Sequence, residues 1–412
     1  MTTFSELDLI ESLQRALAEE GYTTPTPIQS QAIPPLLQGR DLLGVAQTGT
    51  GKTAAFALPI LQRLAQGQPR GRRSVRALIL TPTRELAAQI DDSFARYGRH
   101  LKLSHAVVYG GVGKVPQMRA LRAGVDILIA TPGRLLDLMG DNCVRTEGLE
   151  VLVLDEADRM LDMGFAPDVK RIIATLPKQR QTLLFSATMP QDIAVLADRI
   201  LANPVKVAVT PVATTAERVK QHVLFVDTAN KRALLADLIK GTGISRAIVF
   251  TRTKHGASRL ADQLGRGGIS ADAIHGNKSQ AQRERALDNF RRGRCRVLVA
   301  TDIAARGIDV DGISHVINFD LPNEPESYVH RIGRTARAGA SGSAISFCSA
   351  DERDYLRAIE RLIRQPIEVV DDHPYHCATA QAANGNARPS GQQRGRPPRG
   401  RRPERRYGRR AA

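Results

Sequence analysis

The segment Ala46-Gln47-Thr48-Gly49-Thr50-Gly51-Lys52-Thr53 directly follows the apolar run Leu42-Leu43-Gly44-Val45. This order predicts a strand, then a loop of small residues that closes with Gly-Lys-Thr, then a helix over Ala54–Leu61. Such a turn points backbone N–H groups at phosphates from the positive end of the helix. Lys52 would then reach the outer phosphates, and the hydroxyl of Thr53 would bind Mg²⁺. The segment therefore predicts a site for a nucleoside triphosphate.

The segment Val151-Leu152-Val153-Leu154-Asp155-Glu156-Ala157-Asp158 supplies the second half of such a site. Its four apolar residues predict a buried strand, and Asp155 stands at the carboxyl end of that strand. A carboxylate in this position is the partner that Mg²⁺ needs beside Thr53. Glu156 adjoins Asp155, where it could orient and deprotonate the attacking water. Together the two segments predict an enzyme that hydrolyses a nucleoside triphosphate.

The composition limits the class of protein. The chain has 412 residues, of which 42% are hydrophobic, enough for two domains with cores of their own. It has no apolar run of about 18 residues and no basic and apolar leader, so we expect a cytoplasmic protein with no membrane partner. Four scattered cysteines match no disulfide or zinc framework, and the cluster of His373, His376 and Cys377 is weak evidence for a metal.

Positive charge is concentrated towards the C-terminal end. The formal net charge is +17, and residues 373–412 hold ten arginines and a single acid, Glu404. This charge favours a polyanionic partner such as a nucleic acid. The stretch 391–410 is mainly Arg, Gly, Pro and Gln, which cannot build a core, so it predicts a disordered arm that holds phosphate groups. An inert solubilising tail is the alternative.

Apolar strand-like runs alternate with helical patterns along both halves of the chain. This alternation predicts an α/β fold in which helices cover both faces of parallel sheets. The strands expected in the first half are Leu42–Ala46, Ala77–Thr81, Ala106–Tyr109, Ile127–Thr131, Val151–Asp155 and Thr182–Ser186. Those expected in the second half are His222–Val226, Ala247–Thr251, Ala271–His275, Arg296–Thr301, His315–Asp320 and Ala344–Cys348. Helices are expected at Lys231–Lys240, Gly256–Leu264 and Gln280–Arg291.

The same pattern divides the chain into domains. Prolines and small β-branched residues between Asn203 and Glu217 predict a linker, which we place at residues 206–217. The nucleotide-binding domain is then expected at 31–205, after an N-terminal segment at 2–30, and a second α/β domain at 218–370. Residues 371–412 are expected to form a disordered tail rich in Arg, Gly and Pro.

Further short motifs follow one another over residues 2–370. In the first half they are Phe4, Gly21-Tyr22, Pro25-Thr26-Pro27-Ile28-Gln29, Pro82-Thr83-Arg84-Glu85-Leu86, Gly110-Gly111, Thr131-Pro132-Gly133-Arg134 and Ser186-Ala187-Thr188. In the second half they are Val249-Phe250-Thr251-Arg252-Thr253, Ala300-Thr301-Asp302-Ile303-Ala304-Ala305-Arg306-Gly307-Ile308-Asp309 and His330-Arg331-Ile332-Gly333-Arg334-Thr335-Ala336-Arg337. In this ordered set the chain resembles the DEAD-box ATP-dependent RNA helicase family of superfamily 2, which is named after the tetrapeptide Asp155–Asp158. The compact length and short basic tail are most similar to the bacterial RhlE-like branch.

The resemblance implies two tandem RecA-like domains that close over ATP, Mg²⁺ and single-stranded RNA. It implies that Gln29 selects adenine, that Phe4 packs at the base and that Asp309 contacts the ribose. From its residue type alone, Gln29 would be a polar residue at a helix start. The residues that would couple the nucleotide to the RNA are Asp158, Ser186, Thr188 and His330.

Catalysis is expected to need both domains. Glu156 is the expected base, and Lys52 is expected on the phosphates. Arg334 and Arg337 lie three residues apart, so on a helix they would share one face and could neutralise charge on the transferred phosphoryl group. Because they belong to the second domain, hydrolysis would require the domains to close. The family commonly has glycine in place of Ala336, where a methyl group should fit on a helix.

The expected RNA contacts lie in loops with glycines and arginines. They are Pro82, Thr83, Arg84, Glu85, Gly110, Gly111, Thr131, Pro132, Gly133, Arg134, Thr251, Arg252, Thr301 and Asp302. Glycines let the RNA backbone approach the protein backbone closely, and arginines pair with phosphates. We therefore expect RNA binding that is independent of base sequence. An RNA-annealing protein whose ATPase times release is one alternative, and a DNA helicase is another. Ribosomal or RNA-decay proteins are candidate partners.

Overall fold

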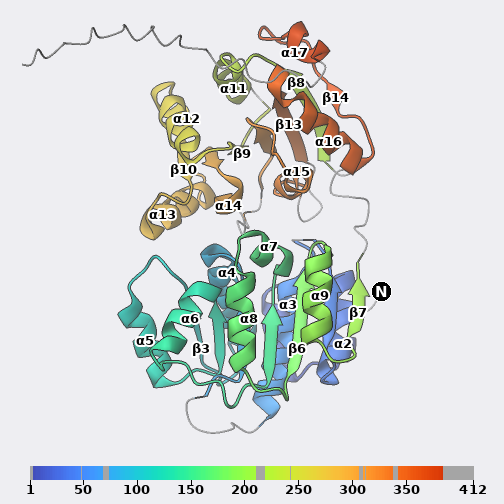
Figure 1. Cartoon of the computed structure of the whole chain (residues 1–412), viewed down its shortest axis with the longest axis vertical. Helices are drawn as coiled ribbons and strands as arrows, with labels where there is room; N and C mark the ends of the chain where they lie inside the picture. The colour runs from blue at the N-terminus through green and yellow to red at the C-terminus, as the bar shows by residue number, and fades with distance from the viewer. Residues whose placement is uncertain are drawn as a thin grey trace, which may run out of the picture.

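The computed structural model describes residues 3–47, 49–67, 74–209, 219–241, 243–305, 310, 312–336 and 342–383. Among the residues expected in the site, Thr48, Asp309 and Arg337 lie outside these ranges. The described chain forms two α/β domains, the first in the lower half of Figure 1 and the second in the upper half. Each is built around one sheet of parallel strands.

The sheet of the first domain has seven parallel strands in the order β3-β4-β2-β5-β6-β1-β7. The strands are β1 (Leu42–Val45), β2 (Ala77–Leu80), β3 (His105–Val108), β4 (Ile127–Ala130), β5 (Val151–Leu154), β6 (Gln181–Ser186) and β7 (Val205–Ala208). Every residue of β2, β4, β5 and β6 is buried. Strands buried on both faces consist of continuous apolar runs, which is why the sequence pattern reveals them.

Helices cover both faces of this first sheet. They are η1 (Phe4–Glu6), α1 (Glu11–Glu19), α2 (Pro27–Leu37), α3 (Lys52–Gln66), α4 (Arg84–Tyr97), α5 (Lys114–Ala123), α6 (Pro132–Gly140), α7 (Ala157–Asp162), α8 (Ala166–Thr175) and α9 (Gln191–Ile200). One face carries α1 to α4, whose buried side chains include Leu13, Phe56 and Phe94. The other carries α6 to α9 through side chains such as Leu135 and Ile172.

The second sheet repeats the first, position for position. Its order is β10-β11-β9-β12-β13-β8-β14, again with all strands parallel. The strands are β8 (Val219–Phe225), β9 (Ala247–Phe250), β10 (Ala271–Ile274), β11 (Val297–Ala300), β12 (His315–Asn318), β13 (Gly342–Cys348) and β14 (Glu368–Val369). The chain thus repeats its architecture.

The helices of the second domain surround this sheet. They are α11 (Lys231–Lys240), α12 (Lys254–Arg266), α13 (Gln280–Arg291), α14 (Asp302–Ala305), α15 (Pro325–Ile332), η2 (Ala350–Glu352), α16 (Arg353–Ile363) and α17 (Ala378–Ala382). In the described part of the chain, no helix combines the length and the apolar character needed to cross a membrane.

The predicted fold class is confirmed, since both sheets are parallel and have helices on both faces. Every expected strand corresponds to an observed strand, with ends that differ by three residues or fewer. The expected start of the linker is wrong, because β7 falls within it and pairs with β1, Leu42 lying opposite Val205. In this edge strand only Val207 is buried, so it lacks an apolar run. Residues 210–217 of the expected linker lie outside the described residues.

The expected start of the disordered tail is also wrong. Residues 371–383 belong to the second domain, because His376 forms an antiparallel bridge with Val226 and Ala380 is buried. The hydroxyl of Tyr375 donates to Asp237 Oδ2 at 2.7 Å. The segment packs through only a few isolated residues, Tyr375, Cys377 and Ala380, so the sequence shows no periodic apolar pattern there. The remaining tail, 384–412, lies outside the described residues.

Candidate functional site

The strand order places the motifs expected to bind the nucleotide on one half of a sheet edge and the motifs expected to bind RNA on the other half. Parallel strands end at the same edge, so the loops that follow them gather there. β5, β6 and β1 are neighbours, and the residues at their carboxyl ends are Asp155, Ser186 and Ala46. β3, β4 and β2 form the other half, and the loops after them contain Gly110, Thr131 and Pro82. This edge faces the second domain (Figure 1).

Lys52 lies across the loop that it closes. The lysine is buried, and its Nζ donates a hydrogen bond to the carbonyl oxygen of Ala46 at 2.8 Å. Within the loop the hydroxyl of Thr50 donates to the carbonyl oxygen of Gln47 at 2.8 Å. Thr53 follows Lys52 in the first turn of α3. The described part of the loop therefore brings the expected lysine and threonine to one helix N-terminus.

Gln29 joins the N-terminal segment to this loop. Its Oε1 accepts a hydrogen bond from the N–H of Thr26 at 2.8 Å, and its Nε2 donates to the carbonyl oxygen of Gly51 at 3.1 Å. Gly51 has φ +92°, and a Cβ there would lie 2.4 Å from Nε2 of Gln29, so conformation and packing both require glycine. Phe4 is buried in the core of the first domain. The contact of either residue with adenine stays a prediction.

Three carboxylates are buried together at the end of β5. Asp155 is only 2% exposed, and Glu156 and Asp158 are also buried. Burial raises the pKa of Asp155 to about 6, while the nearby Lys52 acts in the opposite direction. Glu156 has φ +51°, a left-handed conformation that is uncommon for a residue with a side chain. A constrained backbone thus holds the acid Glu156 beside Asp155, and its role as the base stays a prediction.

Asp158, Ser186 and Thr188 form one hydrogen-bonded group. Oδ2 of Asp158 accepts from the N–H of Thr188 at 2.9 Å and from its hydroxyl at 2.8 Å. The N–H of Asp158 donates to the Ser186 hydroxyl at 3.3 Å, and that hydroxyl donates to the carbonyl oxygen of Thr188 at 2.7 Å. Burial would raise the pKa of Asp158, but the hydrogen bonds from Thr188 and the charges of Lys52 and Arg159 together outweigh burial and lower it. The structure therefore brings together three of the four expected coupling residues.

A cavity of about 470 Å³ lies between the two domains. It is lined by eight of the expected RNA contacts, namely Pro82, Thr83, Arg84, Glu85, Gly110, Thr131, Gly133 and Arg134, and from the second domain by Gly276 and Arg283. Burial and the charge of Arg283 lower the pKa of Arg84. The expected contacts outside its lining are Gly111, Pro132, Thr251, Arg252, Thr301 and Asp302.

Arg283 is a residue of this cavity that the motifs did not reveal. Its Nη2 lies 2.8 Å from Oε1 of Glu85, so a buried ion pair joins the domains. Burial raises the pKa of Glu85, and the charge of Arg283 opposes that rise. One signal could have found the arginine: it shares the apolar face of α13 with Ala286, Leu287 and Phe290. A charge on such a face needs a partner.

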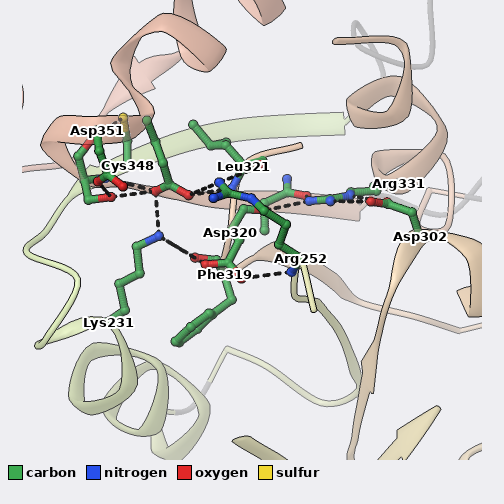
Figure 2. Close-up of polar contacts among 12 residues, drawn as sticks. Lys231, Arg252, Asp302, Phe319, Asp320, Leu321, Arg331, Cys348 and Asp351 are labelled. Atoms are coloured by element: carbon green, nitrogen blue, oxygen red, sulfur yellow. Dashed lines mark hydrogen bonds and ion pairs between the residues drawn. The ribbon is translucent and has the colours of Figure 1, made fainter. Parts of the chain in front are cut away.

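A polar network inside the second domain engages two of the expected RNA contacts (Figure 2). Arg331 makes a two-point ion pair with Asp302, Nε to Oδ1 at 2.6 Å and Nη2 to Oδ2 at 2.7 Å. Arg252 donates from Nη2 to Oε1 of Glu352 at 3.0 Å, and its N–H donates to Oδ2 of Asp320 at 2.9 Å. Both expected contacts thus have partners within the domain, and their contact with RNA stays a prediction.

The expected helix does not extend to Arg334, and Arg337 lies outside the described residues. α15 ends at Ile332, and Arg334 follows in the turn after it, buried, with its Nε donating to the carbonyl oxygen of His330 at 3.3 Å. The prediction that Arg334 lies on a helix face is therefore wrong. Ala336 is not helical either, because its φ of +54° is in the left-handed region. There a methyl group is strained, and glycine would not be.

Two family profiles match most of the described chain, that of DEAD/DEAH box helicases over residues 26–196 and that of the helicase conserved C-terminal domain over 230–339. The DEAD-box ATP-dependent RNA helicase CshA of Bacillus cereus is 43% identical over 371 residues, 90% of this chain and 70% of CshA. The ATP-dependent RNA helicase SrmB of Escherichia coli is 46% identical over 378 residues, 90% of this chain and 85% of SrmB. The chain belongs to the DEAD-box family of ATP-dependent RNA helicases. Its place in the RhlE-like branch stays a prediction.

Solved structures of Dbp5 provide a comparison for the arrangement of the two RecA-like domains in this DEAD-box helicase. A variant of Dbp5 from S. cerevisiae bound to RNA and ADP BeF3 superposes with a TM-score of 0.81 at 32% identity, over 90% of this chain and 96% of Dbp5. With a Gle1 variant and IP6 bound instead, the TM-score is 0.74, and with Nup159, the Gle1 variant, IP6 and ADP it is 0.62. The domains of this helicase therefore lie most nearly as in the RNA-bound form among these three.

Proposed function

We propose that this DEAD-box helicase holds single-stranded RNA in the 470 Å³ cavity without reading its bases. ATP would bind at the adjoining β5-β6-β1 half of the same sheet edge. The observation that carries the proposal is this shared edge, since one movement of the second domain would cover both ligands. Closure would then separate a short duplex or remodel an RNA–protein complex, and hydrolysis would restore the open form. ATP and RNA would each favour the closed arrangement.

Mg²⁺ would be held by Asp155 and Thr53. Both side chains offer the oxygen ligands that Mg²⁺ prefers. Asp155 also lies in a buried group of three carboxylates with Lys52 nearby, an excess of negative charge that a divalent cation would offset. When bound, the ion would neutralise charge on the phosphates. The donor set therefore fits the metal.

Glu156 would accept the proton of the attacking water. Its Oε2 is buried and, in the described part of the chain, has no hydrogen-bond partner, so it is available to a water in the site. Lys52 would hold the outer phosphates from the end of α3. Arg334 would bring positive charge to the transferred group from the second domain, where Asp309 and Arg337 complete the predicted set.

The cavity favours RNA backbone over bases. Arg84, Arg134 and Arg283 supply positive charge, and Gly110 and Gly133 allow close approach to a phosphate. The Arg-rich stretch 391–410 would add contacts that ignore sequence and weaken with salt. We further propose that the helicase acts in the cytoplasm and that its partners include ribosomal or RNA-decay proteins.

The proposal is tested by steady-state ATP hydrolysis with single-stranded RNA or single-stranded DNA of the same sequence. We expect strong stimulation by RNA alone, and ATP-dependent release of a short RNA strand from a duplex. Equal stimulation by DNA would contradict the RNA assignment, because only contacts with the 2′-hydroxyl distinguish the two. Loss of unwinding, with persistence of a strand-annealing activity that depends on the tail, would favour an annealing protein instead.

A further inference from the structure

Arg159, which directly follows the Asp155–Asp158 tetrapeptide on α7, is buried without a full set of partners. Its side chain is 2% exposed. Its Nε lies 3.5 Å from Oε2 of Glu156, too far for a good hydrogen bond but within ion-pair distance. In the described structure neither Nε nor Nη2 has a hydrogen-bond partner. Burying a guanidinium whose donors lack hydrogen-bond partners is unfavourable in free energy, so the burial of Arg159 needs an explanation.

The second domain encloses this arginine. Arg159 is the one residue of the first domain in the lining of a small cavity of about 20 Å³. The other lining residues are Phe250, Asp302, Ala305, Ser327, His330, Arg331 and Arg334. In Figure 1, α7 lies on the side of the first domain that faces α14 and α15. The burial of Arg159 therefore depends on the position of the second domain.

Attraction to charged groups of the second domain does not explain why Arg159 is buried there. Both carboxylate oxygens of Asp302 already accept hydrogen bonds from Arg331. Arg331 and Arg334 carry the same charge as Arg159, so they do not attract it. Among the described residues, Glu156 is the carboxylate within 4 Å of the Arg159 guanidinium. The charge of Arg159 also helps to lower the pKa of Asp158, but Glu156, the expected base, is the nearer carboxylate.

We infer that Arg159 is a positioning residue that holds the carboxylate of Glu156 towards the attacking water when the second domain covers α7. Without that cover, water would surround the guanidinium, and a pair at 3.5 Å would be weak. With it, the same pair lies in a medium of low dielectric constant and restrains the side chain of Glu156. The inference rests on the proposed function and adds a means by which domain closure aligns the base.

The test is ATP hydrolysis at saturating single-stranded RNA for Arg159→Gln and Arg159→Lys. Because a misplaced catalytic group lowers the rate by about 10²-fold, we expect Arg159→Gln to reduce kcat by that order, with the KM for ATP unchanged. Affinity for a fluorescent single-stranded RNA in the presence of AMP-PNP should also be unchanged. Arg159→Lys keeps the charge and should restore part of kcat. In a Glu156→Gln background, Arg159→Gln should have no further effect.

Arg171→Gln is the matched control, since Arg171 is an exposed arginine on α8 that pairs with Asp168. It should behave as the wild type. Normal kcat in Arg159→Gln, with an active wild type and an inactive Glu156→Gln, would overturn this inference alone. So would weakened RNA affinity with an unchanged kcat, which would make Arg159 an interdomain contact. No RNA stimulation of the wild type would instead contradict the proposed function.

Discussion

Glu85 on α4 and Arg283 on α13 lie 2.8 Å apart and form an ion pair between the two domains, in the lining of the 470 Å³ cavity. Each side chain is buried, so each would lack a partner if the domains separated. The pair therefore belongs to the domain arrangement of this structure, which superposes on the Dbp5 variant bound to RNA and ADP BeF3 with a TM-score of 0.81.

Reversing the charge of Arg283 should weaken the closed form. We expect Arg283→Glu to lower affinity for single-stranded RNA by roughly 10-fold in the presence of AMP-PNP, a typical size for a coupling between sites. Affinity without nucleotide should change less. Fluorescence anisotropy with labelled RNA measures both values. Arg285→Glu, an exposed position on the same helix, controls for net charge, and an equal loss with and without nucleotide would show that Arg283 acts on RNA alone.

Ala336→Gly should stabilise the second domain. Ala336 has φ +54°, where a Cβ is strained and glycine is not. Relief of that strain, less the greater freedom of glycine in the unfolded chain, should raise the free energy of unfolding by about 1 kcal/mol. Thermal unfolding measures the difference. A lower melting temperature would mean that the methyl group contributes packing that outweighs the strain.

Lys231 should be essential to the network of Figure 2. Its Nζ donates to Oε2 of Glu352 at 2.6 Å and to the carbonyl oxygen of Phe319 at 2.8 Å. Lys231→Met would leave the Glu352 carboxylate buried with fewer partners, which should lower the free energy of unfolding by about 3 kcal/mol. Denaturant unfolding checks this value. Exposed Lys240 on the same helix provides the control Lys240→Met, and equal effects of both variants would contradict the prediction.

The pair His105–Asp91 should make stability depend on pH. Nδ1 of His105 lies 2.6 Å from Oδ1 of Asp91, and this hydrogen bond raises the pKa of the histidine. A raised pKa in the folded state means that the stabilisation is present below the unfolded pKa of about 6.5, and is lost as pH rises through the folded pKa. His105→Gln should therefore melt lower than the wild type at acid pH, with the difference shrinking at alkaline pH. If the difference in melting temperature between the wild type and His105→Gln is the same at every pH, the ion pair is not the cause of that difference.

The sheets could be predicted because their central strands are buried on both faces and consist of apolar runs. β7 could not, since at the sheet edge it buries only Val207. Residues 371–383 could not, since the bridge of His376 to Val226 and the hydroxyl of Tyr375 leave no periodic pattern. α13 coincides with the helix expected at Gln280–Arg291. The helix expected at Arg334 was wrong, because α15 ends at Ile332.

In the site, the order of residues within one motif could be predicted. Of the contacts between motifs, the grouping of Asp158 with Ser186 and Thr188 was expected from the family resemblance, and the others were not. Lys52 follows its loop directly, and Asp155 follows its strand. The contacts of Gln29 with Gly51, of Arg283 with Glu85 and of Arg331 with Asp302 join residues far apart in the chain. Such contacts depend on how the elements pack, which local pattern does not specify.

The measurement that tests the central claim most directly is steady-state ATP hydrolysis, with and without single-stranded RNA, for the wild type and Glu156→Gln. The account predicts strong RNA stimulation of the wild type and its loss in the variant, with RNA still bound in the presence of AMP-PNP. A fully active Glu156→Gln would contradict the assignment of the base. If RNA does not change the rate of ATP hydrolysis by the wild type, the proposed coupling between the ATP half and the RNA half of the sheet edge is contradicted.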